Sequence, residues 1–122
     1  MDWEISIDQE SNVLYVKTLG LFNMDSTAEL IKECLALIKM RGCRRCLVDN
    51  TGLQLIRIET LEIYSAPAMF SSLGVPRSLH IAQVFSEKHK NELHFLETVC
   101  YNNGYSVSVF SEIELARQWL NK

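Results

Sequence analysis

The sequence predicts an α/β fold in which helices pack on a mostly parallel, five-stranded sheet. Two β-rich runs open the chain, and stretches with helical spacing then alternate with apolar runs in the order ββαβαβαβα. Strands that alternate with helices pair in parallel, whereas the opening pair indicates a β-hairpin. The later apolar runs lack a polar alternation, which is typical of strands buried on both faces. We expect residues 1–122 to form one domain.

The opening hairpin is predicted from residues 3–8 and 13–19. In the first run, Trp3, Ile5 and Ile7 alternate with polar residues, which is the two-residue period of a strand with one wetted face. The second run, VLYVKTL, is rich in β-branched and aromatic residues, and the QESN stretch between the runs is typical of a turn.

A helix is predicted for residues 27–41. Ser26 and Glu29 have the spacing of a capping box, and Gly42 suits the position after the last turn. The apolar face of this helix consists of Leu30, Ile31, Cys34, Leu35 and Ile38. We expect that face to pack against the sheet.

The third strand is predicted at residues 45–49, where the apolar run RCLVD ends at an aspartate. A turn that contains Gly52 should follow, and then a helix over residues 59–74. Pro67 falls inside that helix, and because proline has no N–H we expect a kink or a restart there.

Two further strands are predicted at residues 79–85 and 105–110. Ser86 should cap the helix between them, and Gly104 should end it.

The last helix has the clearest start signal in the chain. Ser111 suits the N-cap and Glu114 the third helical position, which together form a capping box. Phe110, just before the cap, should pack on Leu115 as a hydrophobic staple.

Composition excludes several classes of protein. A net charge of −3 and a pI of about 5.6 argue against nucleic-acid binding, which usually needs a strongly basic face. The apolar runs are far shorter than the roughly 20 residues of a membrane helix, and the acidic start MDWEISIDQE is unlike a secretory signal. We therefore expect a cytoplasmic protein without a membrane span. The spacing of its His, Cys, Asp and Glu residues predicts no metal or cofactor.

Two stretches carry a resemblance to a known family. Residues 96–120, LETVCYNNGYSVSVFSEIELARQWL, combine a helix, an NG pair, an aromatic residue, a VxVF strand, a capped helix and a WL pair. Residues 47–52, LVDNTG, place Asp49, Thr51 and Gly52 as in an LDLSG motif that follows a third strand. On these residues the chain resembles the STAS domain superfamily, in particular its SpoIIAA-like branch, over nearly its whole length.

The resemblance implies a regulatory or protein-interaction domain without catalysis. In anti-sigma-factor antagonists of this superfamily, a partner kinase phosphorylates a serine nine residues after the first aspartate of the motif. Nine residues after Asp49 stands Ile58, so this chain lacks that serine. The hydroxyl nearest to the expected helix start belongs to Thr60, which we interpret as an N-cap, with a phosphosite as the alternative.

The surface that the resemblance implies for a partner or ligand is the corner after the third strand. Its residues are Asp49, Thr51, Gly52, Arg57, Ile58, Glu59 and Thr60. The sequence does not identify the protein partner, and a homodimer is one alternative.

A second function is left open by residues 66–76, APAMFSSLGVP. Met69, Phe70, Leu73 and Val75 are apolar and surround a predicted kink. These side chains either belong to the core, which is the preferred interpretation, or line a groove for a small apolar or lipid-like ligand.

A third possible function is that of a thiol enzyme, which would use Cys43 and Cys46 of a C-x-x-C motif. The motif follows a predicted helix, so it lacks the helix N-terminus that lowers a thiol pKa in redox motifs. No second pair has the spacing of a zinc site. The preferred interpretation is four free thiols, with Cys34 and Cys100 as the others.

Overall fold

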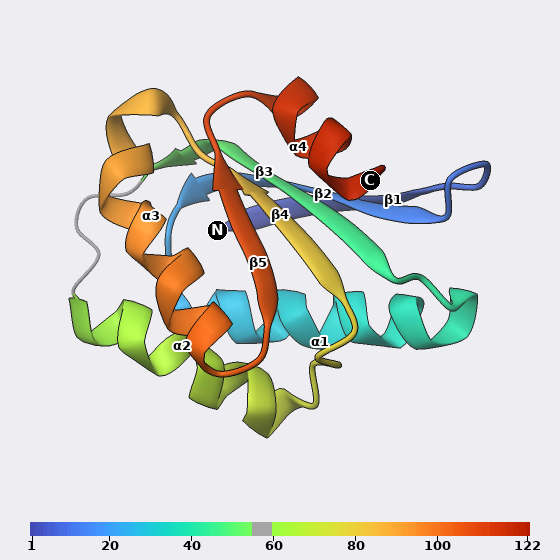
Figure 1. The fold of residues 1–122 in the computed structure, drawn as a ribbon, viewed down its shortest axis with the longest axis horizontal. Coiled ribbons are helices and arrows are strands. Elements are labelled where there is room, and N and C mark those ends of the chain that lie inside the picture. The colour runs from blue at the N-terminus through green and yellow to red at the C-terminus, as the bar shows by residue number, and fades with distance from the viewer. Residues whose placement is uncertain (55–59) are drawn as a thin grey trace.

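The computed structural model contains a single sheet with helices on both of its faces (Figure 1). It describes residues 1–54 and 60–122, without the side chains of residues 60–62 and 90–92. The strands are β1 (Asp2–Asp8), β2 (Val13–Leu21), β3 (Arg45–Gln54), β4 (His80–Val84) and β5 (Ser106–Phe110). The helices of the described part are α1 (Met24–Arg41), α2 (Thr60–Leu73), α3 (Glu87–Asn102) and α4 (Ile113–Leu120).

The five strands lie in the sheet in chain order, from β1 at one edge to β5 at the other. β1 pairs antiparallel with β2, and the other three neighbouring pairs are parallel. The predicted order ββαβαβαβα and the mostly parallel sheet are therefore confirmed. In this register Ile5 lies opposite Val16, and Leu14 lies beside Cys46, so inward side chains of neighbouring strands form rows.

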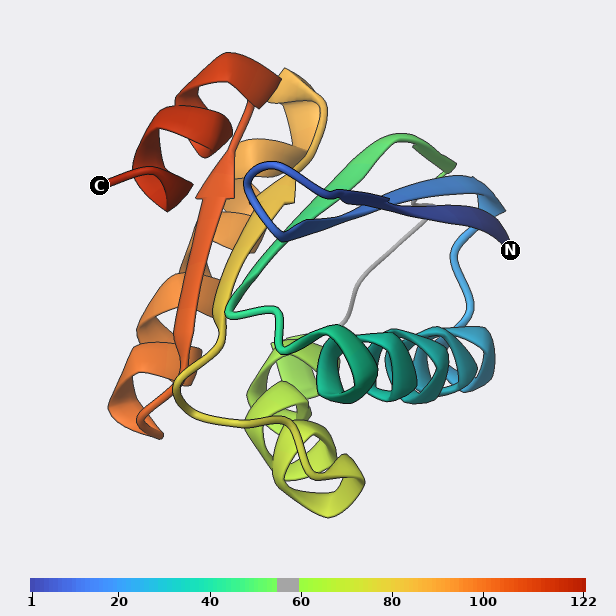
Figure 2. The ribbon, with the colours of Figure 1, turned by 90° about the vertical axis from the view of Figure 1, so that its right-hand side faces the viewer.

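Each face of the sheet is covered by a different set of helices. On one face, side chains of α1, α2 and α3, including Ile38, Phe70 and Cys100, form a large apolar cluster with the strands. On the other face, α4 alone covers a smaller cluster that includes Leu47 and Ala116. Figure 2 shows α4 on the far side of the strands from α1 and α2.

Helix α1 begins earlier than predicted. Its N-cap is Asn23, whose Oδ1 accepts a hydrogen bond from the Ser26 N–H at 2.9 Å. Ser26 therefore lies inside the helix, and the predicted capping box with Glu29 is wrong. Asparagine caps as well as serine does, so the cap one turn earlier adds a turn of helix. The predicted end is confirmed, since Gly42 follows α1 with a φ of 67°.

Helix α4 begins later than predicted. Glu112, not Ser111, is its N-cap, and Leu115 is 45% exposed, so the predicted staple with Phe110 is wrong. Phe110 instead lies 5.9 Å from Trp119, between ring centroids. The later start places the apolar side of α4 on the sheet, where Phe110 and Trp119 pack at the margin of the cluster.

The other predicted helix signals have mixed outcomes. Pro67 lies inside a single helix α2, so the predicted restart is wrong, although its missing N–H leaves the Ile63 carbonyl without that helical partner. Ser86 is the N-cap of α3, and Gly104 follows the end of α3 with a φ of 84°, as predicted.

Candidate functional site

Strand β3 continues through the corner that the sequence predicts as a turn. Asp49 pairs with Lys17 of β2 and with Val84, the last residue of β4. Beyond that point β3 stays paired with β2 as far as Gln54. Thr51 and Gly52 therefore lie in a strand, and the predicted turn is wrong because the long strand β2 offers a partner where β4 has ended.

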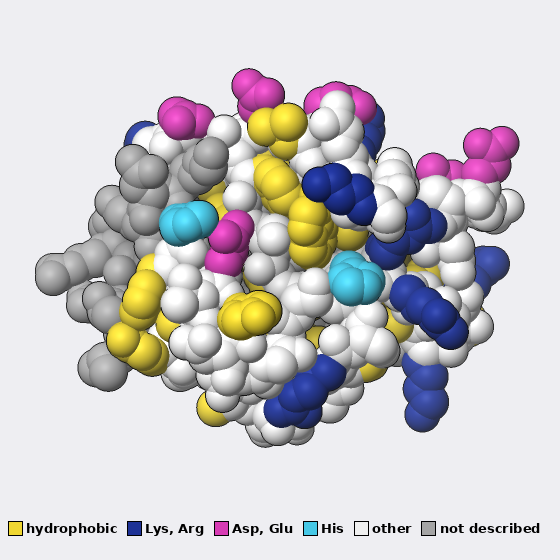
Figure 3. Space-filling model, in the orientation of Figure 1, with side chains coloured by type: hydrophobic (Ala, Val, Ile, Leu, Met, Phe, Trp, Pro, Cys, Tyr) yellow, Lys and Arg dark blue, Asp and Glu magenta, His cyan; other side chains and the backbone are white. Residues whose placement is uncertain are grey.

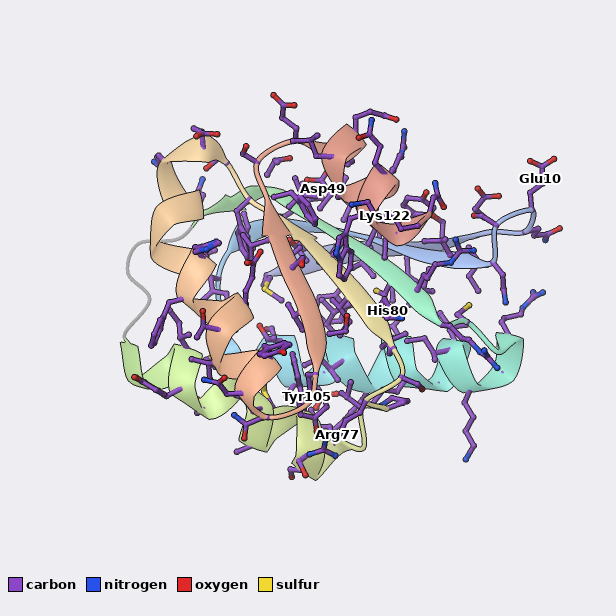
Figure 4. All side chains as sticks on the ribbon, in the orientation of Figure 1. Glu10, Asp49, Arg77, His80, Tyr105 and Lys122 are labelled. Atoms are coloured by element: carbon purple, nitrogen blue, oxygen red, sulfur yellow. The ribbon has the colours of Figure 1, made fainter. Side chains whose placement is uncertain are left out.

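A β-bulge marks the end of the pairing with β4. The register shifts between the Lys17–Asp49 and Leu19–Gly52 pairs, so two residues of β3 lie opposite Thr18 alone. The Asp49 carboxylate accepts hydrogen bonds from Thr51 at 3.0 Å to the backbone N and 2.7 Å to Oγ1. Asp49 lies on the side of the sheet away from α1 (Figure 4), so its charge is held at the surface.

Gly52 lies in a close approach of β3 to β2. A Cβ at this position would lie 2.8 Å from Leu19 Cδ2 and 3.2 Å from the Thr18 carbonyl oxygen. The glycine of the LVDNTG motif therefore permits the tight β2–β3 pairing rather than a turn.

Asn50 faces the same side of the sheet as Val48, two residues earlier, and there it joins three strands by hydrogen bonds. Asn50 is 7% exposed, and its Oδ1 accepts from Thr18 Oγ1 at 2.7 Å. Its Nδ2 donates to Gln83 Oε1 of β4 at 2.8 Å. We name Thr18, Asn50 and Gln83 the amide network. The sequence analysis missed it, although a polar residue next to a buried strand always needs such partners.

The amide network borders a cavity of about 180 Å³ between the sheet and helices α1, α2 and α3. Side chains such as Leu30 of α1, Met69 of α2 and Leu96 of α3 form its walls. Apart from the thiols of Cys34 and Cys46, Thr27 and the amide network provide the only polar side chains among the described lining residues. This space is therefore an apolar chamber with one small polar region.

The cavity explains an unusual exposure in the middle of the sheet. Val48 belongs to the central strand and points toward α1, yet it is only half-buried. Gln83, on the neighbouring strand, is half-buried as well. Both side chains line the cavity, so the helices leave their inward sides uncovered.

The cysteines behave as buried thiols. All four are free and buried. Burial raises the pKa of Cys34 to about 12, with a contribution from Glu33, and raises the pKa of Cys100 to about 11. Burial also raises the pKa of Cys46, so half of the C-x-x-C motif is a neutral thiol near pH 7. This protonation state argues against a nucleophilic role for Cys46.

Of the predicted corner residues, the structure brings Asp49 and Thr51 into contact and places Gly52 in β3. Arg57, Ile58 and Glu59 lie outside the described residues. Helix α2 begins with Thr60, whose side chain is not described, so its interpretation as a cap or phosphosite stays a prediction.

Neither a metal-binding cluster nor a membrane-spanning helix occurs in the described part of the chain. No group of three or more His, Cys, Asp or Glu side chains there could hold a metal ion. Among the described helices, none has both the length and the apolar character needed to cross a membrane.

Comparison with known proteins gives the class of the fold. No protein-family model matches the chain, and neither does any curated protein sequence. A solved structure of an uncharacterised protein from the DUF3478 family of Shewanella loihica PV-4, with a SpoIIAA-like fold, is similar over 98% of this chain and 92% of that chain. The TM-score is 0.60 and the sequence identity is 16%. This chain therefore has a SpoIIAA-like fold, as its sequence predicts.

Proposed function

We propose that this chain is a non-catalytic binding domain that takes a small apolar molecule into the cavity between α1, α2 and the sheet. The observation that carries the proposal is an apolar chamber of about 180 Å³. An engineered apolar cavity of roughly 150 Å³ binds benzene, whereas pockets for drug-sized ligands start near 300 Å³. The fitting ligand is a single aromatic ring or a short acyl chain.

The chemistry of the lining supports this proposal. Protein interiors rarely contain voids much larger than a water molecule. This space is partly open to solvent and almost wholly apolar, so water inside it meets few hydrogen-bond partners. An apolar ligand that displaces this water buries apolar surface and, because it binds the folded state, stabilises it.

Thermal unfolding with isopropylbenzene, an apolar ring of suitable size, tests the proposal. At ten times its dissociation constant the ligand should stabilise the protein by about 1.4 kcal/mol, which raises Tm by a few degrees. Ala66 lines the cavity and Ala68 is exposed on the same helix. Ala66→Phe should abolish the shift and Ala68→Phe should keep it. If wild-type Tm does not respond at saturation, the proposal fails.

A second candidate function is protein interaction, which the SpoIIAA-like fold and an exposed aromatic pair favour. Tyr64 of α2 is 56% exposed and Phe95 of α3 is 36% exposed, and their rings meet edge to face at 5.1 Å. Hydrophobic side chains also reach the surface over α2 and α3 in Figure 3. Exposed aromatic side chains are enriched at protein interfaces.

The homodimer is the simplest form of this interaction, and sedimentation velocity tests it. If the aromatic pair forms the contact, Tyr64→Glu should lower the dimer fraction. Met40→Glu, on an exposed site of α1, should leave it unchanged. A wild-type protein that stays monomeric at every concentration would rule out the homodimer.

We expect any regulation to proceed without phosphorylation of the corner after β3, because Ile58, which has no hydroxyl, stands where anti-sigma-factor antagonists have their serine. Thr60 is the residue that tests this expectation. Intact-mass measurement of the protein from its host should show no added phosphate. A phosphopeptide carrying Thr60 would contradict it.

A further inference from the structure

We propose that Gln83 donates one hydrogen bond to the ligand in the cavity, so that the ligand is a neutral apolar molecule with an oxygen acceptor. This inference rests on the proposed function of the cavity and specifies the chemistry of its ligand. A ketone, an ester or an ether on an aromatic ring or short acyl chain has these properties.

The direction of the amide network leaves the amino group of Gln83 available. Thr18 Oγ1 donates to Asn50 Oδ1 at 2.7 Å, so Asn50 must present Nδ2 to its other neighbour. That neighbour is the Gln83 side chain, whose Oε1 accepts at 2.8 Å. The Gln83 Nε2 group then keeps two N–H donors, and it makes no hydrogen bond to the residues that the structure describes.

The other polar side chains at the cavity are already engaged. Thr18 donates to Asn50, and Asn50 Nδ2 donates to Gln83 Oε1 at 2.8 Å and to the Val48 carbonyl oxygen at 3.4 Å. Thr27 Oγ1 donates to the Asn23 carbonyl oxygen at 2.9 Å, within the first turn of α1. Cys34 and Cys46 also line the cavity, but a thiol is a weak donor. Among the described side chains, Gln83 is therefore the strong donor that a ligand can meet.

Burial makes this donor selective. In the unliganded protein, water can pair with an amide N–H at a polar and roomy site. A hydrocarbon that displaces such water leaves the donor unpaired, whereas an acceptor oxygen replaces the lost bond. The network also fixes the orientation of the Gln83 amide, so little freedom is lost when a ligand binds.

The rest of the lining favours a neutral acceptor over a carboxylate. No Lys, Arg or His side chain lines the cavity within the described part of the chain. Burial of an unpaired carboxylate is very unfavourable, and one amide donor does not compensate for it. The described lining therefore favours a neutral carbonyl or ether compound over a fatty or aromatic acid.

The test compares acetophenone with isopropylbenzene, two ligands of similar shape of which only the ketone accepts a hydrogen bond. Titrations followed by the amide NMR signals of wild-type protein should give about three- to tenfold tighter binding for acetophenone. The Gln83 side-chain NH₂ signal should move when acetophenone binds and move much less with isopropylbenzene.

Gln83→Glu, measured well above the carboxyl pKa, removes the donor but keeps an oxygen for Asn50. This variant should lose the preference for acetophenone, and Gln118→Glu on exposed α4 should keep it. Equal wild-type affinities for the two ligands, or an equal loss of both in Gln83→Glu, would overturn the inference and leave the proposed function standing. If neither ligand binds wild-type protein, the proposed function itself fails.

Discussion

The two faces of the sheet are packed in opposite ways. On the α4 face, Ala82 of β4 and Ala116 of α4 are both 0% exposed, and Leu47 and Val84 beside them are buried almost completely. Small side chains there allow a short helix to lie close to the strands. On the α1–α2 face, three longer helices enclose an apolar chamber, and Val48 in the central strand stays half-buried. One face is therefore fully packed, and the other contains a cavity.

The same alanine-to-leucine substitution should have different effects on stability at the two faces. Ala116→Leu adds carbon atoms where no space remains, and we expect it to lower the free energy of unfolding by about 3 kcal/mol. Ala66→Leu directs the same atoms into the cavity, and we expect no loss or a small gain. Urea unfolding measures both, and equal losses would contradict the difference between the faces.

Removal of the amide network should have the next largest effect. Asn50→Ala leaves Thr18 and Gln83 without their partner, and we expect it to lower the free energy of unfolding by about 2 kcal/mol. Asn102→Ala, at an exposed site on α3, should change it by less than about 0.5 kcal/mol. If both variants are equally stable, the network does not hold the three strands together.

The close β2–β3 approach predicts an unusual sign for a glycine substitution. Alanine usually stabilises a strand relative to glycine, but the Cβ of Gly52→Ala would meet Leu19 Cδ2 at 2.8 Å. We expect a loss of about 1 kcal/mol. The double variant with Leu19→Ala should show a favourable coupling, because that change removes the clashing group. A stabilised Gly52→Ala protein would contradict the tight pairing.

The last expected effect concerns pH. The pKa of Cys34 is raised to about 12 in the folded protein, so the folded state retains a proton that the unfolded state loses above about pH 9. The contribution of the protonated Cys34 thiol to the stability of the folded state is complete below pH 9 and disappears as pH rises toward 12. The free energy of unfolding, measured across this pH range, should fall less steeply for Cys34→Val than for wild type. Identical slopes would show that the thiol is not buried as described.

The fold could be predicted from the sequence because it depends on local periods. The two-residue period of β1 and the helical spacing of α1 are visible within short stretches. The first residue of a helix is harder to predict, since Asn23 and Ser26 are both good caps and lie one turn apart. The turn predicted at Gly52 does not occur, and the reason is long-range: the end of β3 depends on how far β2 extends.

The candidate site depends on contacts that no single stretch contains. Asn50 and Gln83 are 33 positions apart and meet only through the pairing of β3 with β4. The sequence did indicate the apolar residues of α2, and Met69 and Phe70 do line the cavity. Whether such residues fill a core or leave a chamber depends on how far the helices stand from the sheet, which their spacing does not specify.

A methyl NMR titration of wild-type protein with isopropylbenzene tests directly whether the cavity binds an apolar ligand. Methyl groups of Val16, Val48 and Ile81, which line the cavity, should shift as the ligand saturates. Those of Val13 and Leu47 on the α4 face should stay in place. Saturation without shifts at the cavity methyls, or with shifts mainly on the α4 face, would contradict the account.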